Sequence, residues 1–246
     1  MTTIFILMVL ILIFVKSPFG KGIIGEALVN LAIALRLNKN EYHLFKNVTI
    51  RTNDGTTQVD HIIVSKYGIF VIETKNMKGW IFGDENQKTW TQKIYKHTNK
   101  FQNPLHQNYK HTKTLEALFK IDKNKIFSII TFVGDSTFKT EMPVNVTYAG
   151  GFIKFINSKT MKLLSEQEVI NINLLITEKR LSNTLKTHIE HVQHVKDIVQ
   201  EKENKNLCPR CGNTLVKRIS KRGSTKNNEF YGCSSYPKCR YTAQVI

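Results

Sequence analysis

Residues 58–75, QVDHIIVSKYGIFVIETK, contain two runs rich in β-branched and aromatic residues, 58–64 and 69–75, on either side of the four residues SKYG. Such runs favour strands, and a short turn containing glycine favours a hairpin between them. If Val64 pairs with Ile69, the numbers of paired residues sum to 133, and Asp60 lies opposite Glu73. Directly opposed residues have Cβ atoms ~4.5–5.5 Å apart. The sequence therefore predicts a core hairpin that holds two carboxylates side by side.

Two adjacent carboxylates repel each other, and folding alone gives no reason for that arrangement. A divalent cation between Asp60 and Glu73 would turn the repulsion into binding, because hard cations prefer oxygen ligands. Lys75 lies two residues after Glu73 and shares its face, where an ammonium could orient an attacking water or stabilise charge on a phosphate. The pattern predicts phosphodiester hydrolysis that depends on Mg²⁺ or Mn²⁺. The alternative is an ordinary salt bridge on a half-exposed hairpin, since a short Asp…Glu-x-Lys pattern also arises by chance.

A third carboxylate, Glu26, lies in a predicted helix at residues 22–37. This helix places four apolar residues on one face: Ile24, Leu28, Leu31 and Leu35. Glu26 lies on another face, beside small or apolar residues such as Val29. A carboxylate among such residues needs a positively charged partner, either the metal or Lys75. The alternative is a solvated Glu26 at the helix boundary.

The elements outside the hairpin alternate between strands and helices, which indicates an α/β fold. Strands are expected at 45–51, 125–133 and 144–148, with a turn at 53–55. Asn103 and Pro104 are typical of a helix N-cap and first position, so a helix is expected from 104 to about 119. Ser165 and Glu168 form a capping-box pattern that opens another helix.

Residues 4–15 form an unbroken apolar run. Twelve residues at ~1.5 Å each fall short of a ~30 Å hydrocarbon core, but the flanking residues narrow the gap. No basic segment precedes the run, as a signal peptide would require, and Lys16 and Lys21 follow it. The positive-inside rule then predicts a membrane-anchoring helix at residues 1–18 with the bulk of the chain in the cytoplasm. The alternative is a buried or interfacial helix of a soluble protein.

The charge of the chain is strongly positive, with 36 Lys and Arg against 19 Asp and Glu and a formal net charge of +17. Such an excess favours a polyanionic partner, either nucleic acid or an anionic lipid surface. Charge does not choose between the two, and a general bias toward lysine in composition would give the same excess.

All four cysteines lie after residue 207, in the pairs Cys208–Cys211 and Cys233–Cys239. This spacing predicts a tetrahedral four-thiolate Zn²⁺ site of structural type and a reducing compartment. A domain of about 40 residues, here 207–246, needs such a metal because its core is small. Four free thiols are the weaker alternative.

The same segment is basic and aromatic, which suits phosphate contact and base stacking, especially with single-stranded DNA. The candidate nucleic-acid-binding residues are Arg210, Lys217, Arg218, Lys221, Arg222, Tyr231, Tyr236, Lys238 and Arg240. The alternative for the aromatic residues is that they build the small core.

Two stretches resemble known families. Residues 25–26, 59–63 and 68–75, followed by Trp80, Gly83, Trp90, and Asn103-Pro104 with Gln107, resemble the nuclease-related domain, NERD, over roughly residues 20–135. NERD is grouped with the PD-(D/E)-x-K nucleases, so the resemblance implies a mixed sheet flanked by helices and Mg²⁺-dependent DNA cleavage.

The NERD resemblance assigns roles to single residues. It matches Glu26, Asp60, Glu73 and Lys75 to the acidic and lysine positions of the catalytic site, with Asp60 and Glu73 as the metal ligands. It matches Gln107 to a helix glutamine that contacts the phosphate or the metal shell. Residues 207–242 resemble the C-terminal zinc finger of bacterial type I topoisomerases, which implies DNA binding without topoisomerase chemistry.

These observations predict five segments: an anchor helix at 1–18, a nuclease-like core at 20–135, the rest of the α/β domain at 136–180, a helical linker at 181–206 and a zinc ribbon-like domain at 207–246. The leading hypothesis is a membrane-tethered, metal-dependent DNA endonuclease or DNA-processing protein. The alternative is a non-catalytic protein that tethers DNA or a partner at the membrane. A third possibility uses the basic surface for anionic lipid and the finger for protein contacts.

Overall fold

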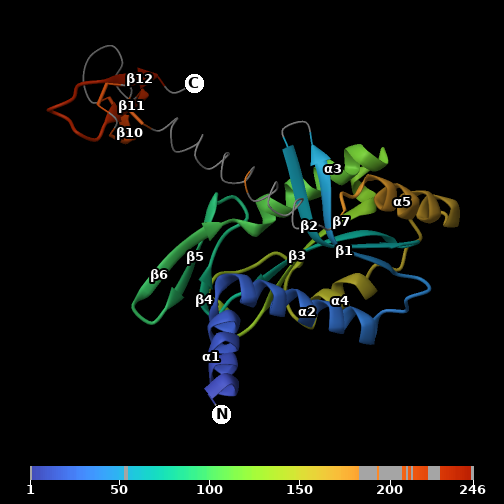
Figure 1. Ribbon diagram of the computed structural model, residues 1–246. Coiled ribbons are helices and arrows are strands. Elements are labelled where there is room, and N and C mark those ends of the chain that lie inside the picture. Colours follow the sequence, from blue (N-terminus) through green and yellow to red (C-terminus); the bar gives the residue numbers. More distant parts are fainter. Residues whose placement is uncertain are drawn as a thin grey trace. The chain divides into compact units, whose positions relative to one another are not determined.

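The computed structural model describes residues 2–52, 55–182, 193, 207–208, 210–211, 213–220 and 228–244. The chain divides into two compact units, Met1–Thr187 and His188–Ile246. Figure 1 traces the elements of each unit.

The first unit is built on a mixed five-stranded sheet of order β1-β2-β3-β7-β9. Its strands are β1 (His43–Thr52), β2 (Gly55–Ser65), β3 (Gly68–Asn76), β7 (Ile126–Val133) and β9 (Val146–Tyr148). The first three are antiparallel neighbours, whereas β7 runs parallel to both β3 and β9. The mixed α/β class expected from the sequence is confirmed.

The register of the β2–β3 hairpin is the predicted one. Val64 pairs with Ile69, and the ladder runs from Ser65 and Gly68 to His61 and Ile72, so that paired numbers sum to 133. The next step of this register would pair the two predicted carboxylates. Hydrogen-bonded pairing ends just before them, while β3 continues beside β7.

Helices cover both faces of this sheet (Figure 1). α3 (Pro104–Phe119) and α5 (Glu166–Lys179) pack on one face, and α2 (Pro18–Arg36) and α4 (Gly151–Asn157) on the other. A short 3₁₀ turn, η1 (Lys123–Lys125), precedes β7. Successive side chains along a strand point to opposite faces of the sheet, so neighbouring residues of one strand belong to two different cores. Ile62 and Val71 join the core under α3 and α5, whereas Ile63 and Ile72 join the core under α2 and α4.

The helix caps are the predicted ones. The side chain of Asn103 accepts a hydrogen bond from the Leu105 N–H, so α3 begins at Pro104. Ser165 and Glu168 form a reciprocal capping box at the start of α5. β9 begins at Val146, two residues later than expected.

The buried face of α2 differs from the apolar face seen in the sequence. Leu28, Leu31 and Leu35 are exposed, and the residues that pack inward include Gly25 and Val29. Gly25 sets this orientation, because a Cβ at its position would lie 2.9 Å from the Cβ of Asn76. The helix lies so close to β3 that only a glycine fits at the contact, and larger leucines are excluded from it.

A second sheet of order β6-β5-β4-β8 was not anticipated. Its strands are β4 (Gly79–Phe82), β5 (Thr89–Ile94), β6 (His97–Gln102) and β8 (Ser136–Phe138). Trp90 of β5 is fully buried and stacks on Phe132 of β7, with ring centroids 6.2 Å apart. The indole thus links the second sheet to the first.

The N-terminal run forms the helix α1 (Thr2–Lys16), whose described side chains are mostly exposed. Among the described residues, α2 is the helix long and apolar enough to cross a membrane. One side of α2 nevertheless contacts β3 and α4, so α2 belongs to the folded domain.

The second unit is a small antiparallel sheet of β10 (Leu215–Ile219), β11 (Glu229–Cys233) and β12 (Thr242–Gln244). Its core consists of three buried cysteines with Leu215 and Tyr241 packed against them. The helical linker predicted for 181–206 lies outside the described residues except for 181, 182 and 193, and the turn residues 53 and 54 lie outside them as well.

Candidate active site and zinc centre

The two predicted carboxylates lie close enough to repel each other. The N–H of Thr74 donates a 2.9 Å hydrogen bond to Oδ2 of Asp60, across the end of the hairpin. Burial raises the pKa of Asp60 well above its ordinary value, and the charge of Glu73 raises it further. Glu73 itself is only 3% exposed. The structure therefore brings Asp60 and Glu73 together at an electrostatic cost.

Lys75 offsets part of that cost. Its Nζ lies 2.7 Å from Oε1 of Glu73 and donates a second hydrogen bond, of 2.9 Å, to Oε1 of Gln107 on α3. Burial alone would raise the pKa of Glu73, but the Lys75 ammonium and His111 together hold that pKa below its ordinary value. The ion pair thus favours the charged form of Glu73, and the Lys75 ammonium is held between Glu73 and Gln107.

α3 contributes a residue that sequence reasoning missed. His111 lies one turn after Gln107 on the same helical face. Its Nε2 lies 3.5 Å from Oε2 of Glu73, and its Nδ1 lies 2.8 Å from Oγ1 of Thr57. The spacing of four residues from Gln107 is the signal that could have identified His111. The threonine fixes the ring so that the other nitrogen faces the glutamate.

Glu26 approaches the pair from α2. It is partly buried, hydrogen-bonds to the side chain of Asn47, and lies near enough for its charge to act on Asp60. Lys75, one of the two partners considered for Glu26, has Glu73 and Gln107 as its hydrogen-bond partners instead.

His61, next to Asp60, is not part of the charged cluster. The residue is fully buried, and burial together with the charge of Lys46 lowers the pKa of its ring to about 4. The ring is neutral at neutral pH, so it does not offset the carboxylates.

The donor set fits a hard divalent cation. Oε2 of Glu73 is buried without a hydrogen-bond partner, although His111 is near. Asp60 offers a second, partly buried carboxylate, and Glu26 a third nearby. Oxygen ligands of this kind are those that Mg²⁺ takes. A cation at this position would add to the positive charge that Lys75 alone supplies beside the three acids.

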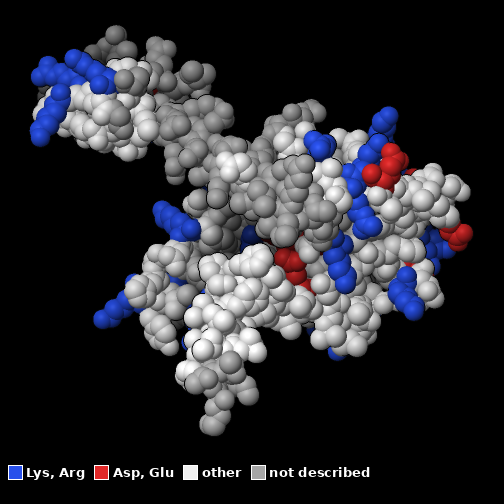
Figure 2. All heavy atoms as spheres, in the orientation of Figure 1, with Lys and Arg blue, Asp and Glu red and all other residues white. Residues whose placement is uncertain are grey.

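The cluster opens onto a hollow. Lys75 lines a cavity of about 590 Å³ together with Lys21 and Lys78, at the start of α2 and the edge of β5. In Figure 2, acidic atoms are visible near the centre of the face, over β3 and α2. An anionic substrate could therefore approach the lysine side of the cluster from solvent.

The second unit contains the zinc site. Each of the four cysteines has its Sγ within 4.8 Å of the other three. Cys208 and Cys239 have Sγ atoms 3.7 Å apart, and Cys211 and Cys233 have theirs 3.4 Å apart. Tetrahedral coordination with Zn–S near ~2.3 Å requires sulfur atoms ~3.8 Å apart. The thiolates fit zinc.

Basic and aromatic side chains surround these cysteines. The Arg218 guanidinium lies 5.8 Å from the ring centroid of Tyr236, and both line a hollow of about 290 Å³ with Arg240. Arg210, Lys238 and Arg240 are exposed. Lys217 is paired with Glu229, opposite the half-buried Tyr231 on the next strand. Lys221 and Arg222 lie outside the described residues.

Comparison with known proteins matches two separate parts of the chain, one in each compact unit. The model of the nuclease-related domain matches residues 21–133, and that of the topoisomerase DNA binding C4 zinc finger matches residues 205–245. An uncharacterized protein of Bacillus anthracis is 36% identical over 184 residues, covering 72% of this chain and 86% of the relative.

Two DNA topoisomerases match smaller parts of the chain. DNA topoisomerase 1 of Methanocaldococcus jannaschii is 43% identical over 47 residues, which are 19% of this chain and 6% of that enzyme. The enzyme of Mycoplasma genitalium is 29% identical over 118 residues, which are 47% of this chain and 16% of the enzyme. No solved structure gives a significant match.

Proposed function

The chain belongs to the nuclease-related domain family, and from that premise we propose that it is a metal-dependent DNA nuclease with a zinc-finger DNA-binding module. The observation that carries the proposal is the cluster of Asp60, Glu73 and Lys75, in which a buried carboxylate oxygen lacks a partner. A fold gains nothing from two desolvated acids at the end of a hairpin. A site that binds a cation and a phosphate requires them.

In the proposed reaction Asp60 and Glu73 would hold Mg²⁺ or Mn²⁺ through their carboxylate oxygens. When bound, such a metal lowers the pKa of a water and neutralises charge on the scissile phosphate. Lys75 carries the ammonium that contacts the phosphate or orients the water. Gln107 and Glu73 hold that ammonium in place, and His111 lies 3.5 Å from the other oxygen of Glu73 without a hydrogen bond to it. The protein thus supplies a preorganised set of charges, which costs no rearrangement during reaction.

The zinc finger supplies affinity for DNA in this proposal. The Arg218 guanidinium lies over the Tyr236 ring, 5.8 Å from its centroid, beside a hollow that Arg240 also lines. An exposed tyrosine ring beside guanidinium groups can stack on a base while the cations contact phosphates. The match of residues 205–245 to the topoisomerase DNA binding C4 zinc finger supports this role.

We also propose that α1 tethers the protein to a membrane. Most of its described side chains are apolar and exposed, and the outer side of α2 continues that surface with Phe19, Ile23 and Leu31. Exposed apolar surface of this extent is unusual for a soluble monomer. After alkaline washing of membranes the protein is expected in the pellet. Release of the protein into the wash would rule out the anchor.

The alternative function, a non-catalytic DNA tether, has one observation in its favour. Lys75 already satisfies one oxygen of Glu73 at 2.7 Å, as an inert structural ion pair would. The alternative predicts DNA binding that survives substitution of Asp60 and fails without zinc.

Cleavage by the full chain in mild detergent separates the two functions. Plasmid, linear and single-stranded DNA are incubated with Mg²⁺, with Mn²⁺ or without added metal. We expect metal-dependent cleavage that Asp60→Asn and Lys75→Met each lower by about two orders of magnitude or more, as removal of a charge-stabilising group does elsewhere. The matched control is Glu178→Gln, a carboxylate exposed on α5. Equal cleavage by Asp60→Asn would exclude the proposed catalysis.

A further inference from the structure

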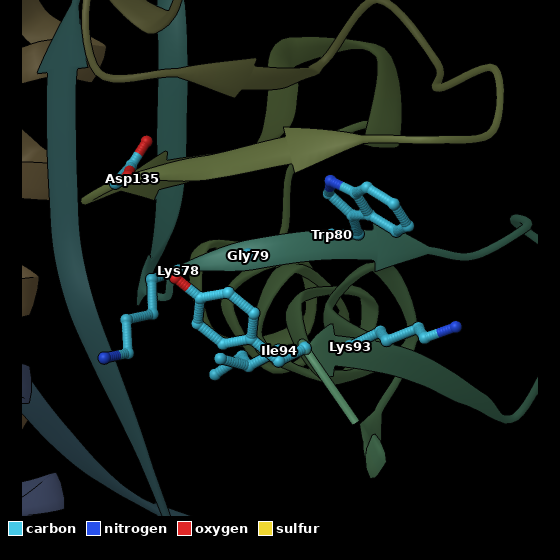
Figure 3. Close-up of a pocket in the computed structure, with 7 residues that line it drawn as sticks. Lys78, Gly79, Trp80, Lys93, Ile94 and Asp135 are labelled. Atoms are coloured by element: carbon cyan, nitrogen blue, oxygen red, sulfur yellow. The ribbon is translucent and has the colours of Figure 1, made fainter. Parts of the chain in front are cut away.

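The second sheet carries an exposed indole between two ammonium groups. Trp80 of β4 is 49% exposed, whereas Trp90, the other tryptophan, is fully buried. Lys93 lies opposite Trp80 on β5, with its Nζ 6.0 Å from the ring centroid. The Nζ of Lys139 lies 4.7 Å from the same centroid. Figure 3 shows the Trp80 ring and the Lys93 side chain projecting from neighbouring strands.

A second aromatic residue lies nearby at a backbone position that folding does not favour for it. Tyr95 begins the two-residue turn between β5 and β6, in which Ile94 pairs with His97. Its φ of 51° lies in the left-handed region, where such turns prefer asparagine or glycine. The side chain is 93% exposed. A bulky aromatic residue held at a strained position and in solvent is explained by a ligand better than by packing.

The two aromatic residues border one cavity of about 430 Å³. Lys78 and Lys93 also line it, and Asp135 is the acidic residue in its wall. Gly79, between Lys78 and Trp80, has φ +80, and a Cβ there would lie 2.5 Å from the Lys93 carbonyl oxygen. The glycine therefore lets β4 approach β5 closely enough to bring the lysines beside the indole.

This cavity continues into the hollow of the candidate active site. Lys78, Ile94 and Asp135 line both cavities, and the second of them includes Lys75. One surface therefore runs from the exposed indole to the lysine of the acidic cluster.

We propose that this surface, the Trp80–Tyr95 platform, binds unpaired nucleotides and leads a single strand to Lys75. That the strand ends at a catalytic lysine rests on the proposed function, whereas binding of nucleotides by the platform does not. Aromatic faces stack on bases of any sequence, and lysines beside them contact the phosphates. In a duplex both faces of each base are already stacked. The platform thus favours single-stranded or flap-like ends over continuous duplex.

The fluorescence of Trp80 reports ligand binding directly, because Trp90 is buried and shielded from ligands. Oligothymidine is titrated into the full chain with Ca²⁺ in place of Mg²⁺, and tryptophan emission is followed together with fluorescence anisotropy of a labelled strand. We expect saturable quenching by oligothymidine and little by a blunt duplex of the same length. A parallel titration with oligouridine tells DNA from RNA as the source of unpaired bases.

Two variants and one control sharpen the test. Trp80→Ala should weaken binding of a short oligothymidine about tenfold, as loss of one stacking residue does, whereas Trp80→Phe should retain most of the affinity. Tyr109→Ala removes an aromatic residue of similar exposure from α3 and should change nothing. Unaltered tryptophan emission while anisotropy reports bound strand, or equal quenching by duplex, would overturn the platform. Cleavage without quenching would support the nuclease and exclude the platform. Quenching without cleavage would support the platform and exclude the nuclease.

Discussion

Replacing Gly25 with alanine should loosen the contact that carries Glu26 to the acidic cluster. The new Cβ would lie 2.9 Å from Cβ of Asn76 and 3.1 Å from Cγ2 of Val133, both on the sheet beneath α2. Overpacking of this kind costs ~1–3 kcal/mol. Alanine has a higher helix propensity than glycine, which raises the free energy of unfolding by ~1 kcal/mol. The net effect is a loss of roughly 0–2 kcal/mol.

Gly22 provides the matched control, since a Cβ at its position meets nothing within 4 Å on the same helix. Gly22→Ala should therefore raise stability by ~1 kcal/mol, and the two variants should differ by ~1–3 kcal/mol. At ~2–4 °C per kcal/mol for a domain of this size, their unfolding midpoints should differ by roughly 2–12 °C. Thermal unfolding of both full-length variants in the same detergent measures the difference. If Gly25→Ala were as stabilising as Gly22→Ala, α2 would not pack on β3 as described.

Three further outcomes are expected. Lys75→Met leaves the buried Glu73 carboxylate without its cation and should lower the free energy of unfolding by ~3–5 kcal/mol in urea titrations; a smaller loss for Lys75→Met than for Lys75→Arg would contradict the ion pair. Zinc removal by a chelator should unfold the second unit, seen as rapid proteolysis within residues 207–246, and resistance to protease would argue against a structural zinc. Glu168, whose pKa is lowered to about 2 by the Ser165 N–H and Lys125, stabilises the fold above its ordinary pKa of 4.5. That modest contribution should fade as pH falls from 4.5 toward 2, and Glu168→Gln should remove this part of the pH dependence in thermal unfolding.

The sequence predicted best where a local rule acts alone. A four-residue turn and the two-residue period of a strand sufficed to fix the register of the β2–β3 hairpin, at whose end Asp60 and Glu73 lie. Capping chemistry likewise located the start of α3, which determines where Gln107 lies. In these cases the interaction partners lie within a few residues or across one hairpin.

The sequence did not predict the elements whose structure depends on packing against residues far away in the chain. β4, β5 and β6 are short, β5 and β6 are rich in polar residues, and Trp90 of β5 is buried against Phe132 on another sheet. The inward face of α2 follows from the close approach at Gly25, which apolar periodicity cannot show. His111 enters the site because α3 lies over β3, where an otherwise ordinary helical histidine faces Glu73.

Binding of a divalent cation tests the central claim most directly. Mn²⁺ titrated into the full chain, with the zinc site filled, can be followed by its electron paramagnetic resonance signal. The account predicts a saturable site that Asp60→Asn loses and Glu178→Gln retains. Equal Mn²⁺ binding by wild type and Asp60→Asn would show that Asp60 and Glu73 do not share a cation.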